Sequence, residues 1–286
     1  MSFPDQNIQT EDKPMPVRER NQEVEEKFKR ERRRQRLEKT VYFIASFALL
    51  LIIWETTRFL NLINPKLFPS VTAVIKSCAV QLSDGSLQKH MYASFLRVLI
   101  SFSIGIVMAV IFGFLIGWFR VIRLLLDPMI NFFRALPPIA LIPLMIIFFG
   151  IGETSKIVVL SYASFFPALV VVYQALVGLD PIYIRAGKTL GASNSELFQK
   201  IILPQLVPHI ITAARVSLGV CWATLVAAEL IAAQKGIGAM MVDAQNFFQM
   251  PPLVLGILLI GIISLAMDAV VRTIEHRATA WREKMS

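Results

Sequence analysis

The sequence is poor in the residues that build metal centres and disulfide frameworks. It has three histidines and two cysteines among 286 residues. No two histidines are spaced i,i+4, as a zinc-hydrolase helix requires, and Cys78 and Cys221 lie in different segments. We therefore predict no metal site and no cofactor on this chain, and we expect both thiols to be inert.

Two further features are missing. Serine, histidine and carboxylate residues are scattered through separate segments instead of forming a clustered nucleophile and base, so the chain is not expected to be an enzyme. The first forty or so residues are polar and contain no apolar h-region, so we expect no cleavable signal peptide.

Charge is scarce as well: 17% of the residues are charged and 55% are hydrophobic, which indicates an integral membrane protein. Basic residues gather in 27-KFKRERRRQRLEK-39, directly before a long apolar segment. Such a run can bind nucleic acid, but beside a span it favours a cytoplasmic location, and no nucleic-acid partner is predicted. We expect residues 1–40 to be a basic, largely disordered cytoplasmic tail and residues 41–286 to be the transmembrane domain.

Six apolar stretches are long enough to cross a bilayer as helices, so the fold class is an all-α membrane protein with six spans. They are residues 41–60, 93–118, 127–149, 156–178, 207–232 and 252–272. The short loops after the second, fourth and sixth spans are basic, on the same side as the tail, so both termini are expected in the cytoplasm. Between the first two spans, Ser70 can cap a short amphipathic helix on the membrane surface.

The third span carries 134-RALPPIALIP-143, where Pro137, Pro138 and Pro143 lack an N–H group. The helix is therefore expected to kink or open there. A break of this kind is tolerated where it is buried in protein or lines a water-filled cavity. Both alternatives, a kinked packing helix and a lining of the solute pathway, stay open.

Charged residues inside spans cost about 2.5 to 3.5 kcal/mol each, so each one needs a partner or a function. Arg97 and Glu229, near the outer ends of the second and fifth spans, either pair as a clamp between helices or line a polar pathway; Trp222, on the same span as Glu229, is a candidate pathway residue. Arg134, beside the proline-rich break, is a second pathway candidate or snorkels to the headgroups. Arg215 lies inside the cytoplasmic end of its span.

The loop between the fourth and fifth spans, residues 178–206, contains Gly187-Lys188-Thr189, the end of a phosphate-binding motif. The first glycine of that motif should stand at position 182, which is Ile182, and no strand precedes it, so a nucleotide site is not expected. The local pattern instead predicts a helix–turn–helix.

In that helix–turn–helix, Asp180 caps a helix that Pro181 opens and that runs to about Leu190. Gly191 makes the turn. Ser193 and Glu196 form the capping box of a second helix, whose apolar stripe ends where Pro204 closes it.

This loop resembles the cytoplasmic coupling loop of ABC importer permeases, whose pattern is Glu-Ala-Ala-x-x-x-Gly followed further on by Ile-x-Leu-Pro. The matching positions are Arg185, Ala186, Gly187, Gly191, Ala192, Phe198, Leu203 and Pro204. Arg185 replaces the usual Glu and Gly187 the second Ala, so a charge contact made by that Glu is lost or reversed here.

From about Trp54 onward the chain is similar to the nitrate/sulfonate/taurine/bicarbonate branch of this family, and 150-GIGETSK-156 with 224-TLVAAELIAA-233 is most like taurine permeases. The resemblance implies a type I permease in the bacterial inner membrane that pairs with a second copy, two ABC ATPase subunits and an extracytoplasmic solute-binding protein. It implies transport of a small anionic solute such as taurine or another sulfonate. Alternatives are nitrate, bicarbonate or another small solute, and a secondary transporter that works without ATP.

Overall fold

The computed structural model describes residues 17–279 except 61, 65 and 66, and this part of the chain holds helices and no strand. The elements are α1 (Val17–Phe59), α2 (Val71–Ser83), α3 (Ser86–Trp118), α4 (Arg120–Ala135), η1 (Pro138–Leu141), α5 (Ile142–Phe149), α6 (Glu153–Val177), α7 (Pro181–Thr189), α8 (Asn194–Glu196), η2 (Leu197–Ile202), α9 (Leu203–Ala232), α10 (Ile237–Asn246) and α11 (Met250–Thr279). They fall into two units, Met1–Asn64 and Pro65–Ser286, which are described separately.

The first unit is the long helix α1, which includes the first expected span. It begins at Val17, inside the stretch for which disorder was expected. Lysine, arginine and glutamate have high helix propensity, and i,i+4 pairs such as Arg34 with Glu38, 3.0 Å apart, add support. The expected disorder of residues 1–16 lies outside the described residues.

The described residues hold five helices that are long and apolar enough to cross a membrane, and six such segments if the bent pair of α4 with η1 and α5 counts as one. The second count equals the six spans expected from the sequence. The two halves of that segment meet at an angle of 85°. Leu136 and Pro137 are extended at the bend, because a residue that precedes proline is disfavoured in the α conformation. The interruption expected from the prolines is confirmed.

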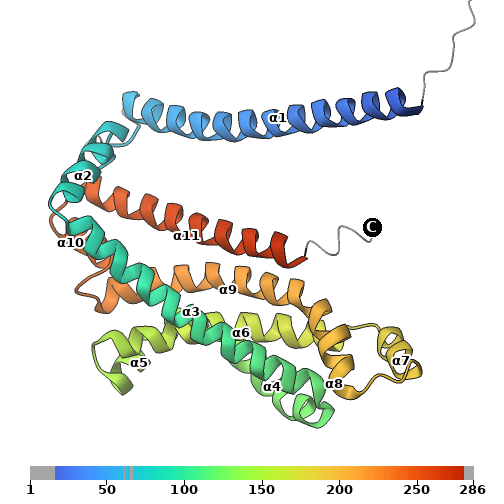
Figure 1. The fold of residues 1–286 in the computed structure, drawn as a ribbon. Coiled ribbons are helices and arrows are strands. Elements are labelled where there is room, and N and C mark those ends of the chain that lie inside the picture. Colours follow the sequence, from blue (N-terminus) through green and yellow to red (C-terminus); the bar gives the residue numbers. More distant parts are fainter. Residues whose placement is uncertain (1–16, 61, 65–66, 280–286) are drawn as a thin grey trace, which may run out of the picture. The chain divides into compact units, whose positions relative to one another are not determined.

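Helices α3, α6 and α9 pack side by side as the core of the second unit (Figure 1). Glycines of α3 lie directly against α6. A Cβ added at Gly113 would lie 2.6 Å from Val172 Cγ1, and one at Gly117 would lie 2.5 Å from Leu176 Cδ2. These glycines, spaced as Gly-x-x-x-Gly, let the two helices approach closely.

Helix α2 begins where the sequence predicts. The Ser70 hydroxyl accepts a hydrogen bond from the Ala73 N–H at 3.1 Å, and Val74 is buried. The helix packs against α11 and α3 within the second unit.

Candidate functional site

The predicted functional residues fall mainly at the two ends of one continuous helix. This helix runs from Asn194 through α8, η2 and α9 to Ala232. Glu229 lies in its last turn, and the loop that carries α7 precedes its first turn. We call these the Glu229 end and the α7 end of the bundle.

At the Glu229 end, Arg97 of α3 and Glu229 of α9 form a buried ion pair. Arg97 Nη1 lies 2.6 Å from Glu229 Oε1, and the two side chains are 6% and 1% exposed. A buried charge that loses its partner is strongly destabilising, so each of these residues requires the other. The pairing favours the clamp among the two alternatives for these residues.

The Glu229 carboxylate is also held by neutral donors. Ser94 donates its hydroxyl hydrogen at 2.7 Å from Oε1 and 2.9 Å from Oε2, and the Gly238 N–H donates to Oε2 at 2.8 Å. The loop after α9 passes so close that a Cβ at Gly236 would lie 2.4 Å from Glu229 Oε1. Gly236 also has φ 136°, a conformation that L side chains rarely adopt. Position 236, beside the Glu229 carboxylate, therefore requires glycine.

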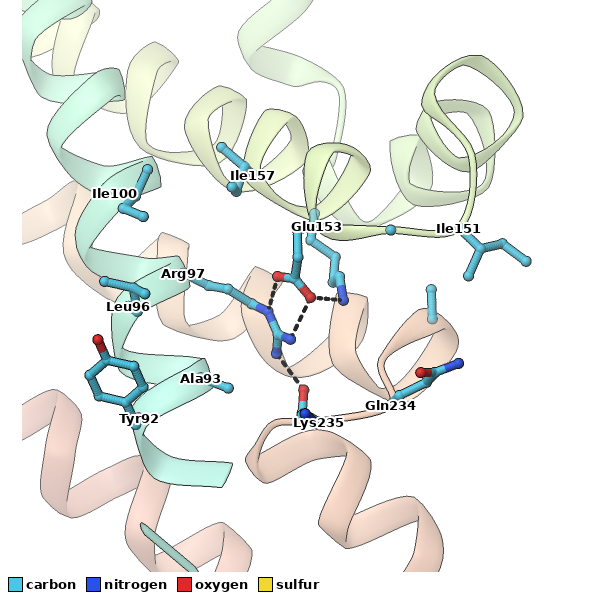
Figure 2. A pocket seen from close by; sticks show the side chains of 13 residues that line it. Tyr92, Ala93, Leu96, Arg97, Ile100, Ile151, Glu153, Ile157, Gln234 and Lys235 are labelled. Atoms are coloured by element: carbon cyan, nitrogen blue, oxygen red, sulfur yellow. Dashed lines mark hydrogen bonds and ion pairs between the residues drawn. The ribbon is translucent and has the colours of Figure 1, made fainter. Parts of the chain in front are cut away.

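The other side of the Arg97 guanidinium faces Glu153, the first residue of α6. Nε donates to Oε2 at 2.6 Å and Nη2 donates to Oε1 at 2.7 Å, a bidentate pair. Lys156 Nζ donates to Glu153 Oε1 at 2.9 Å, and Arg97 Nη1 also donates to the Lys235 carbonyl at 2.6 Å. Figure 2 shows Arg97 between Glu153 and Lys235. Two buried cations thus share Glu153, whose side chain is 58% exposed.

A pocket of about 570 Å³ opens beside this group. Its polar lining includes Arg97, Glu153 and Lys156, and its apolar walls include Leu96 and Ile100 of α3 (Figure 2). A concave site with apolar walls and a few convergent polar groups is the usual form of a small-molecule site.

At the α7 end, the caps and the turn of the predicted helix–turn–helix are confirmed. The Asp180 carboxylate accepts from the Ile182 N–H at 2.9 Å, and Ser193 with Glu196 forms the capping box. Gly191 has φ 79°, its N–H donates to the Lys188 carbonyl, and the Ala192 N–H donates to the Gly187 carbonyl, each at 3.0 Å. This pair of bonds is a Schellman motif. Gly187-Lys188-Thr189 is therefore helical and has no phosphate-loop geometry.

Close packing holds α7 against the following helix. A Cβ at Gly187 would lie 2.4 Å from Leu197 Cδ2 and 2.7 Å from Ile201 Cδ1, which explains glycine at the position where the family pattern has alanine. The Phe198 ring lies 5.3 Å from that of Phe114 and 6.0 Å from that of Trp118, centroid to centroid. The loop is thereby attached to the end of α3.

One prediction for this loop is wrong: Pro204 does not close the second helix. The chain continues as helix through Pro204 into α9. Residues Leu197–Ile202 are π-helical, and the Leu203 N–H donates to the Phe198 carbonyl, five residues back. This wider turn directly before Pro204 accommodates the missing N–H of proline, so the helix does not end there.

The outer face of α7 is exposed and partly apolar. Ile182, Tyr183 and the cap residue Leu190 are exposed, the last at 87%. Arg185 and Ala186 are exposed as well. A groove of about 300 Å³ between α7 and the following helix is lined by residues that include Tyr183, Leu190 and Pro204.

The remaining pathway candidates lie elsewhere. Arg134 and Pro137 are exposed at the bend after α4, Pro138 is half-buried there, and none of them lines the pocket beside Glu153. Trp222 is buried in an apolar cluster with Val98, Leu160 and Leu218, and its Nε1 has no hydrogen-bond partner among the described residues. The structure therefore brings Arg97 and Glu229 together and leaves the other four apart from them.

Three residues that contact Arg97 or Glu229 were not predicted from the sequence: Glu153, Lys156 and Ser94. The one signal for them in the sequence is the expected topology, which places residues 150–156 on the same side of the membrane as Arg97. Arg215, which the sequence places inside the cytoplasmic end of its span, donates from Nε to Asp268 of α11 at 2.8 Å.

An all-helical bundle with a bent membrane segment and a helix–turn–helix before α9 is the architecture expected of ABC importer permeases, and the family match agrees with it. Residues 101–280 match the family described as binding-protein-dependent transport system inner membrane component. The chain belongs to this family, and it is a multi-pass membrane transport subunit and not an enzyme.

Relatives agree with this assignment. A probable ABC transporter permease protein of Brucella abortus (strain 2308) is 40% identical over 216 residues, which cover 76% of this chain and 86% of the relative. The taurine transport system permease protein of Escherichia coli (strain K12) is 36% identical over 243 residues, or 83% and 88% of the two chains. A solved amino acid ABC transporter is 15% identical, with a TM-score of 0.58 over 73% of this chain and 99% of that one, and it supports the type I fold.

Proposed function

We propose that this chain forms the solute pathway of an ATP-driven importer for a small organic anion, such as taurine or another sulfonate, in the bacterial inner membrane. Residues 178–206 couple it to a separate ATPase. The functional unit contains a second copy of the chain, two ATPase subunits and an extracytoplasmic binding protein. In this proposal the α7 end faces the cytoplasm and the Glu229 end faces outward.

The coupling role is supported mainly by the way in which α7 is exposed to solvent on one face and held in place at both ends. The helix offers exposed apolar side chains, Ile182, Tyr183 and Leu190, which suit a protein groove. It is also fixed at both ends, by the Asp180 cap and by the Schellman turn at Gly191. A docking element that transmits motion must be rigid. Gly187 packs α7 closely against η2, and Phe198 of η2 packs against Phe114 of α3, and these contacts supply that rigidity.

The solute class rests on two supports. The relative that is 36% identical over most of both chains is named as a taurine permease. The Glu229 end also holds two buried cations, Arg97 and Lys156, beside a pocket, and guanidinium and ammonium groups bind sulfonate oxygens.

Uptake of labelled taurine tests the proposal in cells that carry the assembled importer. Gly191→Val places a β-branched residue at φ 79°, where it is strained, and we expect membrane insertion to persist while uptake falls below about a tenth. The matched control is Gly191→Asn, because asparagine tolerates this conformation; it should retain most of the uptake. Normal uptake by Gly191→Val would contradict the coupling role, and uptake of nitrate but not taurine by the unaltered importer would contradict the solute class.

A further inference from the structure

We propose that the pocket beside Glu153 is a binding site for the oxyanion group of an organic anion, and that the oxyanion replaces the Glu153 carboxylate on Arg97 and Lys156. This inference rests on the proposed function, because it names the part of the permease that holds the anionic group of the solute.

The two carboxylates that hold Arg97 differ in a way that makes one of them replaceable. Glu229 is 1% exposed and accepts from Ser94 and from the Gly238 N–H in addition to Arg97. Glu153 is 58% exposed, and its described partners are Arg97 and Lys156. Moving Glu229 would strand several buried donors. Moving Glu153 returns a carboxylate to solvent and leaves only the two cations to be satisfied.

The donors that Glu153 occupies suit an anion with three oxygens. Arg97 Nε, Arg97 Nη2 and Lys156 Nζ all point to this carboxylate, and its Oε1 is shared between Nη2 at 2.7 Å and Nζ at 2.9 Å. A sulfonate has three equivalent oxygens, so each donor can receive its own acceptor. The N-terminus of α6 adds to the attraction, because Gly152 provides no side-chain cap for the free N–H groups of the first turn.

Charge balance favours a single monoanion. With Glu153 turned away, Arg97 and Lys156 contribute two positive charges and Glu229 one negative charge, which leaves one positive charge on the buried side chains. Lys235 also lines the pocket, but it is exposed and adds a solvated positive charge. One sulfonate neutralises the buried charge. A buried uncompensated charge is costly, so an empty site would draw Glu153 back, and Glu153 serves as the resting counterion.

The walls of the pocket select for an organic anion. Leu96, Ile100 and Ile157 line it, and its volume of about 570 Å³ is ample for a short alkyl chain beside the charged group. An inorganic anion could meet the cations but would leave these apolar walls in contact with water. We therefore assign the site to short alkanesulfonates and related organic oxyanions.

The test is equilibrium binding of labelled ethanesulfonate to the purified full-length chain in nanodiscs of phosphatidylcholine. Glu153→Gln removes the competing carboxylate charge and is expected to tighten binding about tenfold, because the apparent dissociation constant contains the fraction of sites that are open. Lys156→Gln removes one of the two buried positive charges and should weaken binding about tenfold or more. The matched control is Asp243→Asn, which removes an exposed carboxylate of α10 that does not line the pocket, and it should change binding less than twofold.

Weaker or unchanged binding by Glu153→Gln would overturn the inference and make Glu153 a purely structural partner. A second variant, Glu153→Ser, must agree with Glu153→Gln. Loss of ethanesulfonate binding when phosphatidylglycerol is added to the discs would overturn the inference, because it would show that Arg97 and Lys156 bind a lipid headgroup instead. Taurine uptake by the unaltered importer together with unchanged binding in all variants would overturn this site alone. Tighter binding by Glu153→Gln in an importer that transports no sulfonate would support the site and overturn the proposed solute.

Discussion

Replacement of Glu229 by glutamine tests whether the buried pair with Arg97 holds the Glu229 end together. Glutamine keeps the shape of glutamate but removes the charge, and its NH₂ group must face at least one of the donors that now point to the carboxylate, from Arg97, Ser94 or the Gly238 N–H. Removing one partner of a buried ion pair costs about 3 to 5 kcal/mol. We expect Glu229→Gln to destabilise the protein by about that amount.

The comparison with Glu153→Gln gives this prediction its discriminating power. Glu153 binds the same guanidinium with two hydrogen bonds and also holds the buried Lys156, but its own side chain is 58% exposed beside a pocket, so water can reach the cations it leaves. We therefore expect a smaller cost than for Glu229→Gln, about 1 to 2 kcal/mol. The assay is thermal unfolding of detergent-purified variants, followed by tryptophan fluorescence at one fixed heating rate. Equal losses for the two variants, or a Glu229→Gln protein as stable as the parent, would refute the reasoning from burial.

Three further predictions use the same unfolding assay. Gly236→Ala places a Cβ 2.4 Å from Glu229 Oε1 and should cost about 3 kcal/mol; a silent variant would show that the loop is not bound to the carboxylate. Gly113→Val should separate α3 from α6 and cost about 1 to 3 kcal/mol through overpacking, whereas Gly219→Ala, which meets no atom within 4 Å, serves as its control and should be nearly neutral. Asp268→Asn weakens the half-buried pair with Arg215 and should cost about 1 kcal/mol at most; a loss above about 3 kcal/mol would mean that this pair is effectively dry.

The features that the sequence predicts best depend only on residues that are close together in the sequence. The bend after α4 follows from consecutive prolines, and the loop before α9 follows from a cap, a turn glycine and a capping box within a few positions. Each of these rules operates over one helical turn, so no tertiary information is required. Pro204 shows the limit of such rules, because a π-helical turn just before it changes the hydrogen-bond register and lets the helix continue.

The partners at the Glu229 end could not be predicted in the same way. Arg97 and Glu229 are 132 positions apart. The sequence could offer their pairing as one of two alternatives because the expected topology places both residues on the same side of the membrane. Glu153 and Ser94 carry no local signal of their role, since a glutamate at a helix start and a serine in an apolar helix are common. Gly236 looks like an ordinary turn residue until the backbone is seen to pass within contact distance of the carboxylate.

The unbroken helix from Asn194 to Ala232 has a mechanical consequence. Its 39 residues measure about 58 Å along the helix axis at 1.5 Å per residue. One continuous helical backbone therefore carries the α7 loop at its first turn and the Glu229 carboxylate at its last. A displacement of α7 can reach the contact between Glu229 and Arg97 along this backbone, with no series of side-chain contacts between them.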